Sequence, residues 1–246
     1  PLPLGNGYET MIFVAWCLSL LALGIGRRFP IAAASGLLMS GFALLVASLG
    51  MANPQITPLV PVLRSPWLSL HVSLIMVSYA LLGLLMLNGT AALALAAAAR
   101  AGTAERTSRT LARLRLFGRL LLYPAVFLLT AGIFTGAVWA NASWGRYWGW
   151  DPKEVWALIT LIVYALPLHE RSLARFRRPL FFHAYTLWAF AAVLMTYFGV
   201  NYFLGGMHSY GGGFRPGYAA ATVFAAVTAF ALLTVAALIR QRRTDA

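Results

Sequence analysis

The chain has 246 residues, of which 61% are hydrophobic and only 10% are charged, and its mean hydropathy is +0.76. A soluble domain has about half its residues apolar and about a quarter charged. This composition excludes a soluble globular protein and places the chain in a lipid bilayer. The net charge of +13 would suit a nucleic-acid partner, but the positions of the charges exclude that class as well.

Seven apolar stretches follow one another along the chain, and each is close to the length of about 20 residues that a membrane-spanning helix needs. They cover residues 9–26, 30–50, 67–97, 121–140, 152–169, 180–204 and 217–239. We therefore expect an all-α, polytopic transmembrane helix bundle of about seven spans, in one integral-membrane domain over residues 1–246.

The cationic residues indicate the orientation of this bundle. When successive connections are assigned to opposite sides, one side holds only four of the 19 Lys and Arg residues, which are Arg64, Arg146, Lys153 and Arg215. Cytoplasmic connections of membrane proteins are rich in Lys and Arg. The N-terminus is therefore predicted outside and the C-terminus in the cytoplasm, and the surplus charge requires no nucleic acid.

Two connections differ in composition. Residues 51–66, before the third span, contain four prolines, which oppose helix formation and favour a rigid extended segment. In residues 100–119, before the fourth span, arginines alternate with leucines at near-helical spacing. This second segment is either an amphipathic helix on the inner membrane surface or a basic loop that fixes orientation.

The only cysteine, Cys17, lies in the middle of the first span. One cysteine cannot form an intrachain disulfide, a CxxC redox pair or a CxxCH haem-attachment motif. Any thiol chemistry must therefore use the thiols of another molecule, and Cys17 is interpreted as a packing residue.

The predicted outer connection between the fourth and fifth spans is rich in tryptophan. Residues 139–156 contain five of the eight Trp residues of the chain, which are Trp139, Trp144, Trp148, Trp150 and Trp156. Trp is common at the headgroup level of any membrane protein, but such belts spread over many helix ends. A dense set of flat rings spaced by glycines favours a flat apolar ligand, for which a porphyrin is the obvious candidate.

Charged residues accompany these indoles. Asp151-Pro-Lys-Glu154 has the pattern of a helix N-cap, a proline in the first turn and a capping-box glutamate. We interpret Asp151 and Glu154 mainly as capping residues, with direct contact to a ligand as the alternative. Arg146 and Lys153 either pair with acidic groups of a ligand or are simply solvated.

Histidine is the second informative residue type, because neutral imidazole is a common ligand of haem iron. His71 at the start of the third span and His208 after the sixth lie on the predicted outer face, beside the Trp-rich connection. His169 ends the fifth span at the inner face, about 30 Å away. An inner iron site would need a second ligand, either His183 or a residue of another subunit.

Three separated motifs resemble one known family. Residues 136–156, which include Trp144-Gly-Arg-Tyr-Trp148-Gly-Trp150-Asp151-Pro-Lys-Glu, are similar to the tryptophan-rich "WWD" signature of haem-handling membrane proteins, in the form of the CcsA (also ResC) branch. Residues 59–73 around His71 and 197–210 around His208 agree with that family, as does the segment that starts at Asn6.

The resemblance implies a function. CcsA proteins carry haem from the cytoplasmic side to an outer WWD site, where two histidines that correspond to His71 and His208 ligate the iron, while His169 corresponds to an inner ligand. The cofactor-binding residues expected from the resemblance are Trp139, Trp144, Arg146, Trp148, Trp150, Asp151 and Trp156. His183 corresponds to no known functional position and is interpreted as structural.

The resemblance also implies partners and a reaction. With a membrane subunit of the CcsB (ResB) type, such proteins act as a cytochrome c synthase, or haem lyase, that attaches haem b (iron protoporphyrin IX) to the CxxCH thiols of apocytochrome c. The expected location is a bacterial-type plasma (inner) membrane, with the active site on the periplasmic side. Two alternatives remain open at this point: a haem transporter or chaperone without synthase activity, and a cytochrome b-type electron carrier.

Overall fold

The computed structural model of the chain describes residues 7–28, 30–48, 64–204, 206–207 and 217–245, and over these ranges it contains helices and no strand. The all-α prediction is thereby confirmed. The helices are α1 (Gly7–Ile25), α2 (Pro30–Ser48), α3 (Pro66–Ala98), α4 (Ala104–Trp144), α5 (Pro152–Ala165), α6 (Pro179–Leu194), α7 (Val200–Phe203) and α8 (Gly217–Asp245). Short 3-10 turns lie at Ala101–Thr103 (η2), Leu166–His169 (η3) and Ala174–Arg177 (η4), and a π-helical segment lies at Met195–Gly199 (η5).

A helix occupies each of the seven apolar stretches. Five helical segments of the described chain are long and apolar enough to cross a membrane, namely Gly7–Gly24, Pro66–Ala98, Ala104–Trp144, Pro179–Phe203 and Val223–Gln241. The second stretch contributes a shorter apolar helix over Ala33–Ser48, and α5 has 14 residues. The chain is thus a multi-pass helical membrane protein, whereas the count of seven spans and their orientation stay predictions.

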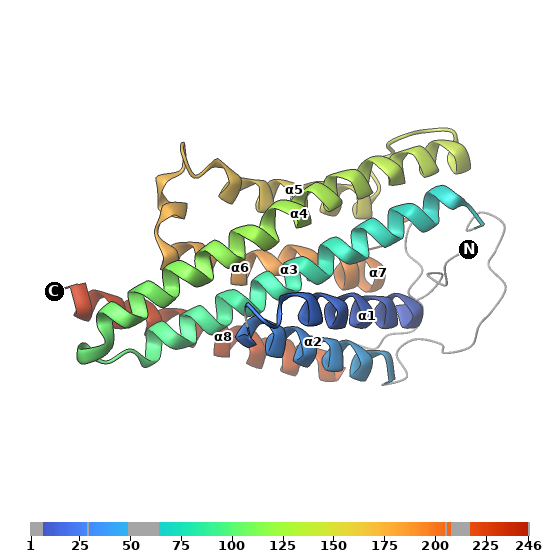
Figure 1. Cartoon of the computed structure of the whole chain (residues 1–246). Helices are drawn as coiled ribbons and strands as arrows, with labels where there is room; N and C mark the ends of the chain where they lie inside the picture. Colours follow the sequence, from blue (N-terminus) through green and yellow to red (C-terminus); the bar gives the residue numbers. More distant parts are fainter. Residues whose placement is uncertain (1–6, 29, 49–63, 205, 208–216, 246) are drawn as a thin grey trace.

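Helices α3 and α4 form a long antiparallel hairpin through the molecule (Figure 1). At 1.5 Å per residue, their 33 and 41 residues extend about 50 and 60 Å, beyond the roughly 30 Å of a hydrocarbon core. The predicted amphipathic segment 100–119 is indeed helical from Ala104 onward. The alternative of a basic loop is wrong for residues 104–119, because they continue without a break into the fourth span as part of α4. Their position at the inner membrane surface stays a prediction.

The core lies where α3 and α4 meet and α1 and α6 pack against them. Leu82, Leu85 and Leu129 are fully buried there, and the Ser78 hydroxyl donates to the Ala125 carbonyl at 2.8 Å. Burial of each such leucine contributes roughly 1.5–3 kcal/mol in water; between helices in lipid, close packing supplies the attraction. The hairpin therefore forms a fixed frame for what lies at its two ends.

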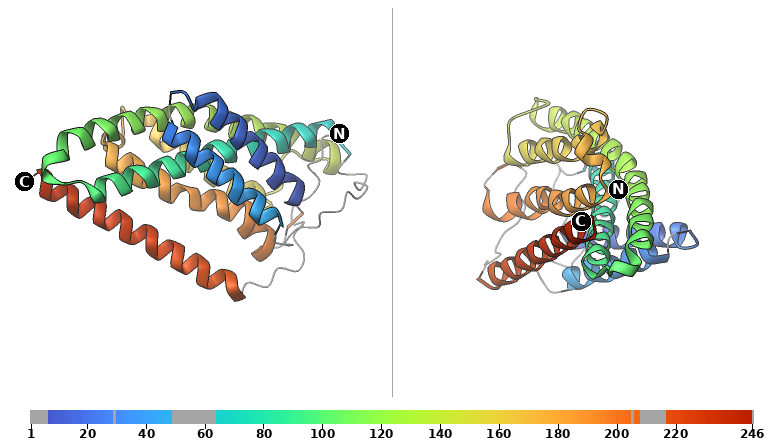
Figure 2. Two further views of the ribbon diagram at one scale, coloured as in Figure 1. Left: turned by 60° about the horizontal axis from the view of Figure 1, so that its bottom comes forward. Right: turned by 90° about the vertical axis from the view of Figure 1, so that its left-hand side faces the viewer.

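The two ends of the bundle carry different elements. The start of α3, the end of α4 and α7 lie together at one end, and the α3–α4 connection and the C-terminal end of α8 lie at the other (Figures 1 and 2). Helix α8 diverges from the bundle toward its N-terminal end (Figure 2) and contacts it near its C-terminal end, where Arg240 donates to the Ala99 carbonyl. We call the end with the start of α3, the end of α4 and α7 the Trp end, and the end with the α3–α4 connection the Arg end.

Candidate functional site

The Trp-rich connection leaves α4 and enters α5 through two residues in the left-handed backbone region. Gly145, with φ of 72°, ends α4 and donates its amide to the Asn141 carbonyl at 2.9 Å. Trp150 has φ of 58°. A bulky residue in this region costs about 1–3 kcal/mol, and the conformation persists only where the surrounding structure holds it. Backbone strain is therefore concentrated at an indole of the predicted site.

Glu154 supplies the restraint on Trp150. Its Oε2 accepts the amide of Gly149 at 2.8 Å and the amide of Asp151 at 3.1 Å, so one carboxylate holds the backbone on both sides of the strained residue. Asp151 in turn accepts the Lys153 amide at 3.0 Å through Oδ1. The predicted capping box at the start of α5 is confirmed, and it also fixes the strained turn.

The second carboxylate oxygen of Asp151 reaches a distant segment. Asp151 Oδ2 accepts the amide of Met207 at 2.6 Å, and the Asp151 side chain is buried. A Cβ on Gly206 would collide with the same oxygen, so glycine permits this close approach. Arg146 donates to the Met207 sulfur at 2.8 Å. Both contacts tie the Trp-rich connection to the residue that precedes His208, which itself lies outside the described residues.

A further polar contact anchors α5 to α7. Lys153 donates from Nζ to Asn201 Oδ1 at 2.7 Å, and Asn201 Nδ2 donates to the Tyr197 carbonyl at 2.7 Å. Lys153 precedes the apolar part of α5, which begins at Val155. The start of α5 is thereby held to the element that leads into residues 206–207.

The indoles of the site differ in exposure. Trp139 is 1% exposed in the core, and its ring lies 4.7 Å from that of Trp144 at an interplanar angle of 65°. Trp148 and Trp150 lie 5.9 Å apart and perpendicular, and Trp150 is 73% exposed. Trp156 is half-buried on α5. Trp139 thus supports Trp144 from within, whereas Trp150 presents a broad apolar surface outward.

His71 is held with a defined tautomer. Its Nδ1 lies 2.6 Å from the Gly132 carbonyl of α4. A carbonyl can only accept, so Nδ1 carries the proton and the lone pair lies on Nε2. A Cβ on Gly136 would lie 2.6 Å from the same Nδ1, so Gly136 leaves the room that the imidazole occupies, whereas a Cβ on Gly132 would meet Ile75. A histidine whose Nδ1 donates to a backbone carbonyl is the usual form of a metal ligand.

His169 has the same arrangement at the other end of α5, because its Nδ1 lies 2.9 Å from the Ala165 carbonyl and its side chain is exposed. His183 differs. Its side chain is fully buried, with Nε2 3.3 Å from the Leu111 carbonyl and Nδ1 without a partner among the described residues. The geometry suits His169 better than His183 as an iron ligand.

Sequence reasoning missed three contributors to this geometry. The glycine pair Gly132 and Gly136 has the small-xxx-small spacing of close helix contacts, so that signal was present. No sequence pattern identifies Met207 as the partner of Asp151, since the two are separated by 56 residues.

Comparisons with known proteins agree with these features. The sequence model of the family described as cytochrome C assembly protein matches residues 4–208. The chain is 42% identical over 211 residues to the protein NrfI of Wolinella succinogenes, and the matched region is 86% of this chain and 23% of NrfI. It is 37% identical over 220 residues to the cytochrome c biogenesis protein CcsA of Chlamydomonas reinhardtii, a match that covers 85% of this chain and 61% of that protein. With CcsA of a Synechococcus strain it shares 37% over 248 residues, with 85% and 77% covered.

The helical bundle and the two polar ends define a polytopic membrane protein with a Trp-rich connection at one end. The chain belongs to the cytochrome c assembly family, and within it to the CcsA proteins of cytochrome c biogenesis. It spans less than two thirds of NrfI and of the Chlamydomonas CcsA.

Proposed function

We propose that this protein presents haem b, with a subunit of the CcsB or ResB type, for covalent attachment to apocytochrome c. The Trp end faces the outer, periplasmic side of a plasma membrane. His71 and His208 ligate the iron there, and Trp144, Trp148 and Trp150 contact the ring. The observation that carries this proposal is the 2.6 Å contact between His71 Nδ1 and the Gly132 carbonyl. Because a carbonyl only accepts, this contact favours the Nδ1–H tautomer, whose lone pair lies on Nε2.

The remaining residues have supporting roles in this proposal. Trp139 backs Trp144, and Trp156 lies on the first turns of α5 beside the strained turn. Asp151 positions the segment that leads into His208 through Met207. Arg146 is exposed and donates to the Met207 sulfur, and its guanidinium pairs with a haem propionate in this proposal. His169 serves as an iron ligand at the Arg end, with its second ligand from the partner subunit.

The reaction requires no net oxidation or reduction. A cysteine thiol of the CxxCH motif adds across a haem vinyl group: its sulfur forms a bond to one vinyl carbon, and the proton goes to the other. The protein's contribution is to hold the vinyl group where an incoming thiol meets it, which replaces an improbable bimolecular encounter. The absence of a CxxC or CxxCH motif in this chain fits this role, since both thiols belong to the substrate.

The test is a maturation assay with the partner and an apocytochrome in a host that lacks other cytochrome c maturation systems. His71→Ala and His208→Ala are each expected to abolish covalent cytochrome and to lower the haem content of the purified complex. Added imidazole should restore haem in either variant, which shows that the bundle is folded. Unchanged haem content, visible spectrum and cytochrome yield in either variant would refute the ligand assignment. Haem binding without covalent product in the unaltered complex would favour a transporter instead.

A further inference from the structure

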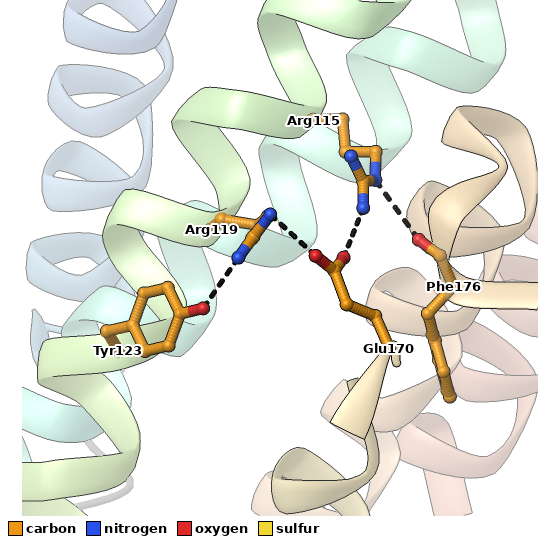
Figure 3. Close-up of polar contacts among 5 residues, drawn as sticks. All are labelled: Arg115, Arg119, Tyr123, Glu170 and Phe176. Atoms are coloured by element: carbon orange, nitrogen blue, oxygen red, sulfur yellow. Dashed lines mark hydrogen bonds and ion pairs between the residues drawn. The ribbon is translucent and has the colours of Figure 1, made fainter. Parts of the chain in front are cut away.

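An ion cluster joins the connection between α5 and α6 to helix α4 (Figure 3). Glu170, directly after η3, binds Arg115 through Oε2 and Arg119 through Oε1, the latter at 2.8 Å. The three side chains are 18–31% exposed. One carboxylate shared by two guanidinium groups is a more restrictive contact than a single ion pair. Among the described ion pairs, the other is Arg109–Glu105, whose side chains are 73% and 80% exposed.

Arg115 holds the connection at a second point. Its Nε donates to the Phe176 carbonyl at 3.0 Å (Figure 3), and Phe176 is buried against Phe181 and Tyr185. The guanidinium therefore binds both before and after the exposed basic turn at residues 171–175. Arg119 is held in turn by the Tyr123 hydroxyl at 2.6 Å. The connection is therefore attached to α4 at two points, the Glu170 carboxylate and the Phe176 carbonyl.

His169 lies inside the segment that this cluster fixes. It immediately precedes Glu170, and its carbonyl accepts the amides of Ser172 at 3.0 Å and Leu173 at 2.8 Å. Its imidazole is fixed by the Ala165 carbonyl. The backbone that aims the imidazole is thus bounded by α5 on one side and by the carboxylate of Glu170 on the other.

We propose that Arg115, Arg119 and Glu170 are positioning residues that aim His169 at its iron. This inference rests on the proposed function, because that proposal makes His169 a ligand. An exposed ion pair contributes at most about 1 kcal/mol, which the Arg109–Glu105 pair represents. The Arg115–Glu170–Arg119 cluster is different, because it acts on the residue adjacent to the ligand, as the outer-shell partners of metal ligands do.

The test uses the complex of the full protein with its partner subunit, in a His71→Gly background so that the haem spectrum reports the Arg end. Glu170→Gln and Arg115→Gln are compared with His169→Gly. Glu105→Gln and Arg109→Gln, which alter the exposed ion pair of α4, are the matched controls. We expect Glu170→Gln and Arg115→Gln to weaken haem retention by about 10- to 100-fold. The controls should retain haem as the background does. Added imidazole should restore the low-spin spectrum of the Glu170 variant, as it does for His169→Gly.

The outcomes distinguish the positioning role of the Glu170 cluster from the ligand role of His169. If His169→Gly loses haem but the Glu170 and Arg115 variants do not, the positioning role is overturned and the ligand role stands. Loss of haem in the Glu170 variant without rescue by imidazole means general destabilisation and also overturns the positioning role. If His169→Gly itself keeps its haem and spectrum, the ligand role of His169 in the proposed function fails.

Discussion

Replacing Asp151 with alanine removes two hydrogen bonds that point in different directions. Oδ1 caps α5 by accepting the Lys153 amide, and Oδ2 accepts the Met207 amide at 2.6 Å. Loss of an N-cap costs about 1 kcal/mol, and loss of a hydrogen bond to a buried charged group costs about 1.5–3 kcal/mol. The two losses act on different segments. The second should appear as faster opening around Met207, by about 10- to 150-fold.

Hydrogen exchange of the purified protein, followed on peptides that contain Met207, measures this opening. Asp151→Asn is the graded variant, because its amide offers one acceptor oxygen where the carboxylate offers two; it should protect either α5 or Met207, but not both. Glu105→Ala, which removes an exposed carboxylate from the first turn of α4, is the control and should leave Met207 unchanged. Equal exchange at Met207 in the Asp151→Ala variant and the unaltered protein would refute the reasoning.

Three further changes test other contacts. Gly136→Ala should displace His71, since the new Cβ would lie 2.6 Å from Nδ1; the haem spectrum should change, whereas Gly41→Ala, which meets nothing within 4 Å, should leave it unaltered. Trp150→Gly should relieve about 1–3 kcal/mol of backbone strain, so the thermal unfolding midpoint should not fall, whereas the haem content should. A midpoint that falls together with the haem content would contradict the strain argument. His183→Gln should keep the complex's haem content, and a lost haem would revive the electron-carrier alternative.

Local patterns predicted local structure. The helical stretches and the capping box at Asp151 were confirmed because each depends on residues within a few positions of one another. The helical character of residues 104–119 was also visible in the spacing of their leucines. The continuity of this segment with the next span was not predicted. A proline within a helix usually breaks or kinks it, but Pro124 is accommodated inside α4.

Contacts between residues far apart in the chain could not be predicted from the sequence. The left-handed conformation of Trp150 could not be predicted from residue preferences, because bulky residues rarely adopt it; in the structure the nearby carboxylate of Glu154 holds the backbone on both sides of it. The Glu170 cluster likewise looks like part of a basic connection until α4 brings Arg115 to it across 55 positions. Of the predicted site residues on the Trp-rich connection, Arg146 and Asp151 contact Met207, whereas the approach of this connection to His208 stays a prediction.

Helix α4 carries anchoring groups for both imidazoles, Gly132 for His71 and Arg119 for the segment that holds His169. These two positions are 13 residues apart, or about 20 Å along a helix. A single rod therefore sets the spacing between the two candidate iron positions. Inserting one residue between Arg119 and Gly132 would turn one anchor by about 100° around the helix relative to the other. Sequence changes between them that preserve both anchors must therefore be substitutions, which leave the length of the helix unchanged.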